Sequence, residues 1–220
     1  MSSQYHKINT IYKRDPETKF KTLLEGDYST EEFWYLRDNM WEWEEKIDGM
    51  NIRVMWDGIN VRYGGKTDNA HIPSRLLDNL AEIFSKEKMA AQFGASIVTM
   101  YGEGCGPKIQ KGGGLYFSSP QFILFDIRIG KWWLRREDIR GIACGLKCRV
   151  APVIMQGPLS QAVEWARMGG HESIYQTDQP GAMPKMAEGL VGRPTLELTA
   201  RDGSRIITKI KAKDFPRSGE

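Results

Sequence analysis

Three lysines recur at every second position near the end of the chain, in the segment R-I-I-T-K-I-K-A-K-D-F. Because successive side chains of a strand point to opposite faces, Lys209, Lys211 and Lys213 are expected to share one face. Three like charges in a row repel each other, and a polyphosphate or a nucleic acid would neutralise them. Lysines that protect the edge of a sheet from aggregation are the open alternative.

A second pair of cations is predicted from a hairpin. The Asp57-Gly58 pair separates two alternating runs and predicts a two-residue turn. That register would place Arg53 directly opposite Arg62 and would turn the other face, which includes Ile59, toward the core. Opposed cations are destabilising unless an anionic ligand or nearby acidic side chains neutralise them, and the sequence leaves these two explanations equal.

A lysine and a carboxylate occur two residues apart in the segment E-K-I-D-G. Strand alternation points Lys46 and Asp48 the same way. Taken alone, this segment also fits a charged, solvated strand end before a glycine turn. Its meaning therefore depends on the motifs that accompany it.

The elements that would position these side chains are mixed along the chain, which indicates an α+β protein with a single domain over residues 1–220. Helices are predicted for 29–39, 74–88, 135–144 and 160–168. Strands are predicted for 41–47, 51–56, 59–63, 96–103, 121–129, 187–193 and 205–211. The strand 121–129 is almost continuously apolar up to Asp126, so we expect it to be a buried central strand.

Composition limits the functional classes. A net charge of +3 on 220 residues does not by itself indicate nucleic-acid binding. The three cysteines are too few and too irregularly spaced for a disulfide framework or a four-ligand zinc site, so reduced thiols are expected. No apolar run is long enough to cross a membrane and no signal peptide is evident, which predicts a cytoplasmic protein without a membrane partner. The glycine-rich segment at 101–116 lacks the spacing of a P-loop or a dinucleotide fingerprint.

Five segments occur in an order that resembles the covalent nucleotidyltransferases, the superfamily of DNA ligases, RNA ligases and mRNA-capping enzymes. They are E-K-I-D-G-M-N-I-R, Y-G-E-G-C-G-P-K-I-Q-K-G, F-I-L-F-D-I, E-G-L-V-G-R-P and K-I-K-A-K-D-F. The asparagine of K-x-x-G-x-N and the element G-E-x-x-G-P-x-x-Q-K are most similar to the RNA-ligase family of RNA-repair and RNA-editing ligases. The resemblance implies a nucleotidyltransferase (ATP-grasp-like) fold of two packed antiparallel sheets with flanking helices, and a nucleotide bound between the sheets.

The resemblance also implies roles for matched residues. Lys46 would be the nucleophile that forms a lysyl-AMP phosphoramidate, and Asp48 and Glu188 would serve Mg²⁺ or Mn²⁺. Contacts to ATP are expected from further residues: Glu45, Asn51, Arg53, Arg62, Glu103, Phe125, Lys209 and Lys211. Of these, Glu103 would contact the ribose, Phe125 would stack on adenine, and Lys209 and Lys211 would hold the α-phosphate. Contacts to nucleic acid are expected from Lys111, Arg193 and Lys213, although Arg193 is a mild departure from the family pattern.

The predicted chemistry explains the clustered cations. A lysine attacks phosphorus only as the neutral amine, and at pH 7 an ordinary lysine is almost entirely protonated. Nearby Mg²⁺ and the cations Lys209 and Lys211 would disfavour the ammonium form of Lys46 and would stabilise charge on the phosphoryl oxygens. AMP would then pass to a 5′-phosphate RNA end, which a 3′-hydroxyl would attack.

Three alternatives remain for the function. A DNA ligase or a capping guanylyltransferase would share the motifs, and a nucleotide-binding relic without activity would give no reason for the charged residues to occur together. The substrate could be single-stranded RNA ends or a nicked duplex. Only residues 216–220 follow the last motif, whereas family members usually carry a further C-terminal domain, so we also expect that a partner chain could supply that domain.

Overall fold

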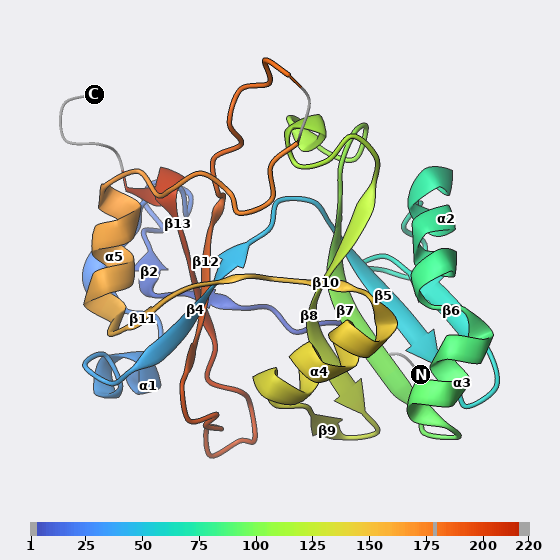
Figure 1. Ribbon diagram of the computed structural model, residues 1–220. Coiled ribbons are helices and arrows are strands. Elements are labelled where there is room, and N and C mark those ends of the chain that lie inside the picture. Colours follow the sequence, from blue (N-terminus) through green and yellow to red (C-terminus); the bar gives the residue numbers. More distant parts are fainter. Residues whose placement is uncertain (1–3, 178–179, 216–220) are drawn as a thin grey trace. The chain divides into compact units, whose positions relative to one another are not determined.

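The computed structural model describes residues 4–177 and 180–215, and its contacts fall into two compact units (Figure 1). The first unit comprises Met1–His6, Ile47–Ala151 and Tyr175–Lys185. The second unit comprises Lys7–Lys46, Pro152–Ile174 and Met186–Glu220. The chain passes from the second unit to the first between Lys46 and Ile47. The assignment of one domain to residues 1–220 stays a prediction.

The second unit is built on a five-stranded sheet in the order β1-β13-β12-β4-β11. Its strands are β1 (Asn9–Thr10), β4 (Trp41–Lys46), β11 (Val153–Gly157), β12 (Gly189–Pro194) and β13 (Thr208–Lys211). One face packs on an apolar core with α5 (Leu159–Arg167), where Trp41 and Trp43 are fully buried. Also in this unit are α1 (Glu31–Tyr35), the antiparallel pair β2 (Tyr12–Arg14) and β3 (Leu23–Tyr28), and the 3₁₀ turn η2 (Ala212–Asp214).

The first unit contains a six-stranded sheet whose main path is β10-β8-β7-β5-β6, with β9 paired to β8. Its strands are β5 (Met50–Trp56), β6 (Val61–Gly64), β7 (Val98–Cys105), β8 (Gln121–Ile129), β9 (Trp132–Trp133) and β10 (Arg149–Val150). Three helices, α2 (Ser74–Ile83), α3 (Lys86–Phe93) and α4 (Arg136–Leu146), contribute to its main core, and η1 (Gly113–Leu115) is a short 3₁₀ turn. Both large sheets are mostly antiparallel, as predicted, but β1–β13 and β8–β10 are parallel pairs.

The predicted hairpin register is wrong by two residues. Asp57 Oδ1 accepts hydrogen bonds from the backbone N–H groups of Ile59 (3.0 Å) and Asn60 (2.7 Å), which stabilises a four-residue loop in place of a two-residue turn. Trp56 therefore pairs with Val61, and Ile59 is 64% exposed at the loop.

Arg53 and Arg62 are consequently not opposed. Arg53 pairs with Gly64 in the sheet, is fully buried, and donates to the Gly65 carbonyl and the Asp68 carboxylate, both at 2.7 Å. Arg62 lies opposite Met55 and is exposed. In this register the two arginines do not repel each other across the hairpin, so they give no reason to expect an anionic ligand there.

Two further elements differ from expectation. The predicted helix 74–88 is interrupted after Ile83, and Ser85 caps a separate helix, α3, by accepting a hydrogen bond from the Lys88 N–H. Strand β13 ends at Lys211, so Lys213 lies in the 3₁₀ turn η2 and does not continue the row of strand lysines. None of the helices in the described part of the chain is both long and apolar enough to cross a membrane.

Candidate functional site

Three neighbouring strands of the second unit place two lysines beside one glutamate. Strand β12 lies between β4 and β13 (Figure 1). Gly189 on β12 pairs with Lys46 on β4 and with Lys211 on β13, so the three residues form one row across the sheet. Glu188 immediately precedes this row. Its carboxylate receives hydrogen bonds from the Lys46 ammonium and, at 2.5 Å, from the Lys211 ammonium.

Gly189 is required by the close approach of these strands. A Cβ atom at this position would lie 2.1 Å from the Ile210 carbonyl oxygen and 3.0 Å from the Lys211 Cα. Any larger residue would push β12 away from β13. The glycine of the E-G-L-V-G-R-P motif therefore keeps Glu188 within reach of both lysines.

Glu188 is surrounded by more positive charge than it can neutralise. Its burial alone would raise its pKa, but the charges and hydrogen bonds of Lys46 and Lys211 lower it below the usual value. Lys209 lies one residue pair further along the same face of β13, is half-buried, and has no carboxylate within ion-pair distance among the described residues. Burial, then repulsion from Lys46 and Lys211, lowers the pKa of Lys209. The cluster of Lys46, Glu188, Lys209 and Lys211 thus carries an excess of cations suited to a phosphate.

The unfavourable ammonium charge of Lys209 predicts that replacing this lysine with a neutral residue stabilises the fold. Because the pKa of Lys209 is lower in the folded chain than the usual 10.5, its ammonium form is less favourable folded than unfolded. We expect Lys209→Met to raise the free energy of unfolding at pH 7 by about 0.5–1 kcal/mol. The difference should shrink as the pH rises through the lowered pKa of Lys209 in the folded chain, and it should disappear above 10.5, where the unfolded chain has also lost this proton. Denaturant unfolding at pH 7, 9 and 10 measures this, with exposed Lys213→Met as the control; an equal gain at every pH would contradict the electrostatic cause.

Sequence reasoning missed a fourth cation near this cluster. Arg14 on β2 is close enough that its charge contributes to the lowered pKa of Lys209, and its Nη2 atom lies 2.5 Å from the Asp214 carboxylate. Arg14 lies outside the five motifs. Only its long-range pairing with Asp214, 200 residues away, reveals its position.

Two charged residues of the second unit that were predicted to bind ligands form hydrogen bonds within the protein. Glu45 is buried on the opposite face of β4, where its carboxylate accepts hydrogen bonds from the Ser173 hydroxyl and, at 2.9 Å, from the Ile174 N–H. Arg193 is 5% exposed and donates to Glu44 at 2.6 Å. The roles predicted for Glu45 in nucleotide binding and for Arg193 in nucleic-acid binding stay predictions.

In the first unit, Asp48 is held by three side chains. The Tyr116 hydroxyl accepts a hydrogen bond from the Asp48 N–H at 3.2 Å, and the Gln110 amide donates to the Asp48 carbonyl. The Lys185 ammonium lies 3.3 Å from the Asp48 carboxylate and 5.0 Å from the centre of the Tyr116 ring. Lys185 belongs to none of the five motifs and was not predicted. The nearby loop segment fixes it, since the Gln176 side chain bonds both the N–H and the carbonyl of Lys185.

The residues expected to contact the nucleoside lie on adjacent strands of the same unit. Asn51 on β5 is directly opposite Glu103 on β7. Gly49 packs so closely on β7 that a Cβ atom would lie 2.3 Å from the Gly104 carbonyl oxygen and 2.9 Å from the Glu103 side chain. The glycine of K-I-D-G therefore fixes the spacing between this turn and Glu103.

Phe125 is the extra residue of a β-bulge. Tyr101 pairs with Asp126 whereas Gly102 pairs with Leu124, so Phe125 has no partner in the ladder of β7. Bulges redirect side chains and are frequent next to functional sites. The Phe125 ring is half-buried and meets Tyr5 edge-on at 5.0 Å. Lys111, also predicted, lies exposed in the turn after Gln110.

The charges fit a divalent cation that arrives with phosphates. No group of three or more His, Cys, Asp or Glu side chains within the described ranges could hold a metal ion by itself. Asp48 and Glu188, the predicted metal residues, are each paired with lysine. Mg²⁺ commonly binds through one or two carboxylates, water and substrate phosphates, which is compatible with such single carboxylates. None of the three cysteines, all of which lie in the described part of the chain, forms a disulfide, and burial raises the pKa of the Cys148 thiol to about 12.

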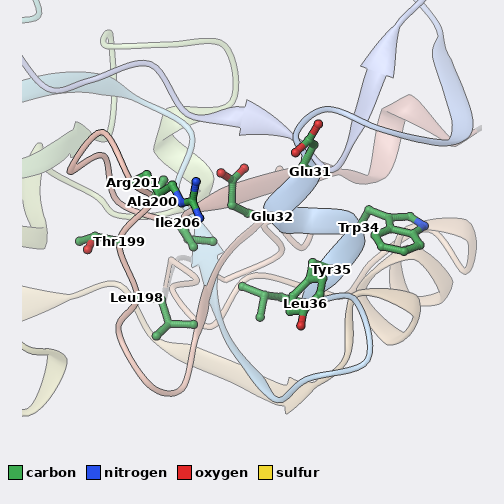
Figure 2. Close-up of a pocket in the computed structure, with 10 residues that line it drawn as sticks. All are labelled: Glu31, Glu32, Trp34, Tyr35, Leu36, Leu198, Thr199, Ala200, Arg201 and Ile206. Atoms are coloured by element: carbon green, nitrogen blue, oxygen red, sulfur yellow. The ribbon is translucent and has the colours of Figure 1, made fainter.

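A separate pocket of about 960 Å³ lies on the second unit (Figure 2). It is lined by Glu31, Glu32, Trp34, Tyr35, Leu36, Leu198, Thr199, Ala200, Arg201 and Ile206. None of the four residues of the lysine cluster lines it. Its two carboxylates against one guanidinium make it a poor phosphate site.

Comparison with solved structures identifies the fold. A lysine-to-alanine variant of the Naegleria gruberi RNA ligase with ATP and Mn matches with a TM-score of 0.66 and 15% identity, over 96% of this chain and 56% of that chain. A glutamate-to-alanine variant with ATP and Mn gives a TM-score of 0.64 and 16% identity over the same shares. The same ligase with PPi gives 0.61 and 16% identity, over 96% and 58%. The chain has the fold seen in a little over half the length of these RNA ligase structures.

The family is established from sequence. The family model described as RNA ligase matches residues 39–211, which contain the first four motifs in full and the fifth as far as Lys211. The chain therefore belongs to the RNA ligase family, as its motif order predicted. A search of curated proteins found no match.

Proposed function

We propose that the chain is an ATP-dependent RNA ligase of the covalent nucleotidyltransferase class, in which Lys46 accepts AMP. The observation that carries this proposal is the lysine cluster, where Lys46 and Lys211 share Glu188 while Lys209 lacks an acidic partner among the described residues. An α-phosphate would supply the missing negative charge. Membership of the RNA ligase family supports ligation as the overall reaction.

The first step would form a bond between the Lys46 amine nitrogen and the α-phosphorus of ATP and release pyrophosphate. In the resting cluster, Glu188 favours the ammonium form of Lys46, whereas Lys209 and Lys211 oppose it. If Glu188 instead contacts the divalent cation, the neighbours of Lys46 are mainly cationic, which favours the neutral, nucleophilic form of its amine. Lys209 and Lys211 would then stabilise the charge that develops on the α-phosphoryl oxygens.

The resemblance to RNA ligases also implies nucleotide contacts for residues of the first unit. Glu103 would contact the ribose and Phe125 the adenine ring, with Asn51 beside Glu103. Asp48 and Glu188 would serve Mg²⁺ or Mn²⁺, which when bound supplies positive charge to the phosphates. Solved structures of the Naegleria gruberi ligase contain ATP or AMP together with Mn, which supports an ATP-using enzyme with a divalent cation.

Incubation of the chain with α-labelled ATP or GTP, followed by denaturing electrophoresis, tests the first step. We expect covalent label from ATP and not from GTP, since the proposed class of RNA ligase uses ATP. Equal labelling by GTP would favour a capping-type guanylyltransferase. No label from either nucleotide in the presence of Mg²⁺ and Mn²⁺ would contradict the proposed chemistry.

We also expect the joining step to prefer RNA. The 2′-hydroxyl lets a protein distinguish RNA from DNA. Given a preformed 5′-adenylylated strand, the chain should join an RNA 3′-end faster than a DNA 3′-end of the same sequence. Matched oligonucleotides that differ only in the terminal 2′-hydroxyl measure this, and equal or faster use of DNA would favour the DNA-ligase alternative.

A further inference from the structure

An exposed aromatic ring between two lysines marks the loop that joins β2 to β3 in the second unit. Phe20 is 61% exposed, and its neighbours Lys19 and Lys21 are also exposed. Neither lysine forms an ion pair with any residue that the structure describes, whereas Lys13 on the adjoining strand pairs with Asp27 at 2.7 Å. The loop therefore presents an uncovered ring with two available cations beside it.

The backbone of this loop has a defined conformation at the residue that carries the ring. Lys19 and Phe20 have consecutive left-handed conformations, with φ values of 56° and 62°. Such a conformation costs about 1–2 kcal/mol for each non-glycine residue. Hydrogen bonds within the loop maintain it, from the Lys19 N–H to the Pro16 carbonyl (3.0 Å) and from the Phe20 N–H to the Asp15 carbonyl (2.9 Å). Strain that is maintained in this way is frequent at functional positions.

Arg14 ties the loop to the strand that carries the phosphate-binding lysines. Its Nη1 atom donates to the carbonyls of Phe20 (3.3 Å) and Lys21 (3.2 Å), and its Nη2 atom pairs with Asp214 at 2.5 Å. Asp214 lies in η2, which directly follows β13 and its lysines Lys209 and Lys211. The Arg14 guanidinium thus links the backbone of the loop that carries Phe20 to the turn that follows β13.

We propose that Phe20, Lys19 and Lys21 form a contact site for single-stranded RNA, in which the ring stacks on a nucleobase and the two ammonium groups contact flanking phosphates. Aromatic rings among cations are how proteins hold single strands without reading sequence. The proposal rests on the proposed ligase function for the choice of RNA as the ligand. The two residues that flank the ring, Lys19 and Lys21, are both cationic, which favours a polyanionic strand over a protein partner; the exposed Glu17 of the same loop lies three residues before the ring.

Fluorescence anisotropy with a labelled, 5′-phosphorylated single-stranded RNA tests the site. Phe20→Ala should weaken binding roughly 5- to 150-fold, the range for loss of one base–aromatic stack. Phe20→Trp should keep the affinity of the wild type because it keeps a stacking surface. Lys21→Ala should lower the slope of log affinity against log salt by about one, whereas Phe20→Ala should leave that slope unchanged.

Trp34→Ala is the matched control, since Trp34 is also exposed (55%) but lies in the acidic pocket of Figure 2. It should not alter RNA affinity. An affinity within twofold of the wild type for Phe20→Ala, or an equal loss in Trp34→Ala, would overturn the proposed contact. Labelling by ATP without RNA separates this site from the ligase proposal: Phe20→Ala should be labelled normally, and loss of its labelling while it remains folded would show that Phe20 acts in adenylylation and not in RNA contact.

Discussion

Lys46→Ala is expected to abolish covalent labelling by ATP. The substitution removes the amine that would bond to the α-phosphorus. Lys46 is the residue of β4 that pairs with Gly189, and neither Lys209 nor Lys211 lies at that position of the sheet. Denaturing electrophoresis after incubation with α-labelled ATP should therefore show no labelled band, whatever the time of incubation. This is a complete loss and not a slower rate, because the covalent acceptor itself is missing.

Lys46→Arg separates the nucleophile from its charge. Arginine keeps a cation that can pair with Glu188, but its guanidinium is not deprotonated in proteins and cannot attack phosphorus. This variant should melt near the temperature of the wild type and still carry no label. Lys86→Ala, at an exposed position at the start of α3, is the control that should be labelled normally. Label on either Lys46 variant would place the nucleophile elsewhere.

Much of the fold follows from local sequence patterns. The strand 121–129 has its predicted bounds, and β4 and β5 differ from prediction by one residue at one end. These segments are predictable because burial of alternating or continuous apolar residues fixes them locally. Short pieces such as β1, β9 and β10 were missed, since two-residue strands carry no periodicity.

The register of the β5–β6 hairpin could not be read from the sequence. An Asp-Gly pair favours a two-residue turn, yet the Asp57 carboxylate instead bonds the N–H groups of Ile59 and Asn60. The competing hydrogen bonds of an aspartate side chain and of a tight turn differ by too little to be ranked from sequence. The two-residue shift in register removed the proposed pairing of Arg53 with Arg62.

The candidate site was only partly predictable for a related reason. Motif order picked out Lys46, Glu188 and the β13 lysines, and the structure brings these four side chains together in the second unit. Lys185 and Arg14 were missed because their partners, Asp48 and Asp214, are 137 and 200 residues away. Such pairs depend on tertiary structure, and a single sequence contains no signal for them.

Glu188→Gln and Lys211→Met are expected to slow adenylylation while leaving the chain folded. Lys211→Met removes a cation that would stabilise the reacting phosphate, and Glu188→Gln removes a carboxylate that would serve the divalent cation. The loss of one such electrostatic contribution typically lowers a rate by about 10²–10³-fold. Glu188→Gln keeps the shape of the side chain but leaves Lys46 and Lys211 without their shared carboxylate, so some loss of stability at neutral pH should accompany it.

Because the ion pairs lower the pKa of Glu188, the stability that its carboxylate contributes is present above the usual pKa of 4.5 and is lost as the pH falls through the lowered value. The stability difference between wild type and Glu188→Gln should therefore disappear in acid, whereas the rate defect at pH 7 should persist. Single-turnover labelling rates and acid unfolding curves of both variants measure these effects, and near-normal labelling rates in both would show that the lysine cluster does not contact the phosphate that reacts.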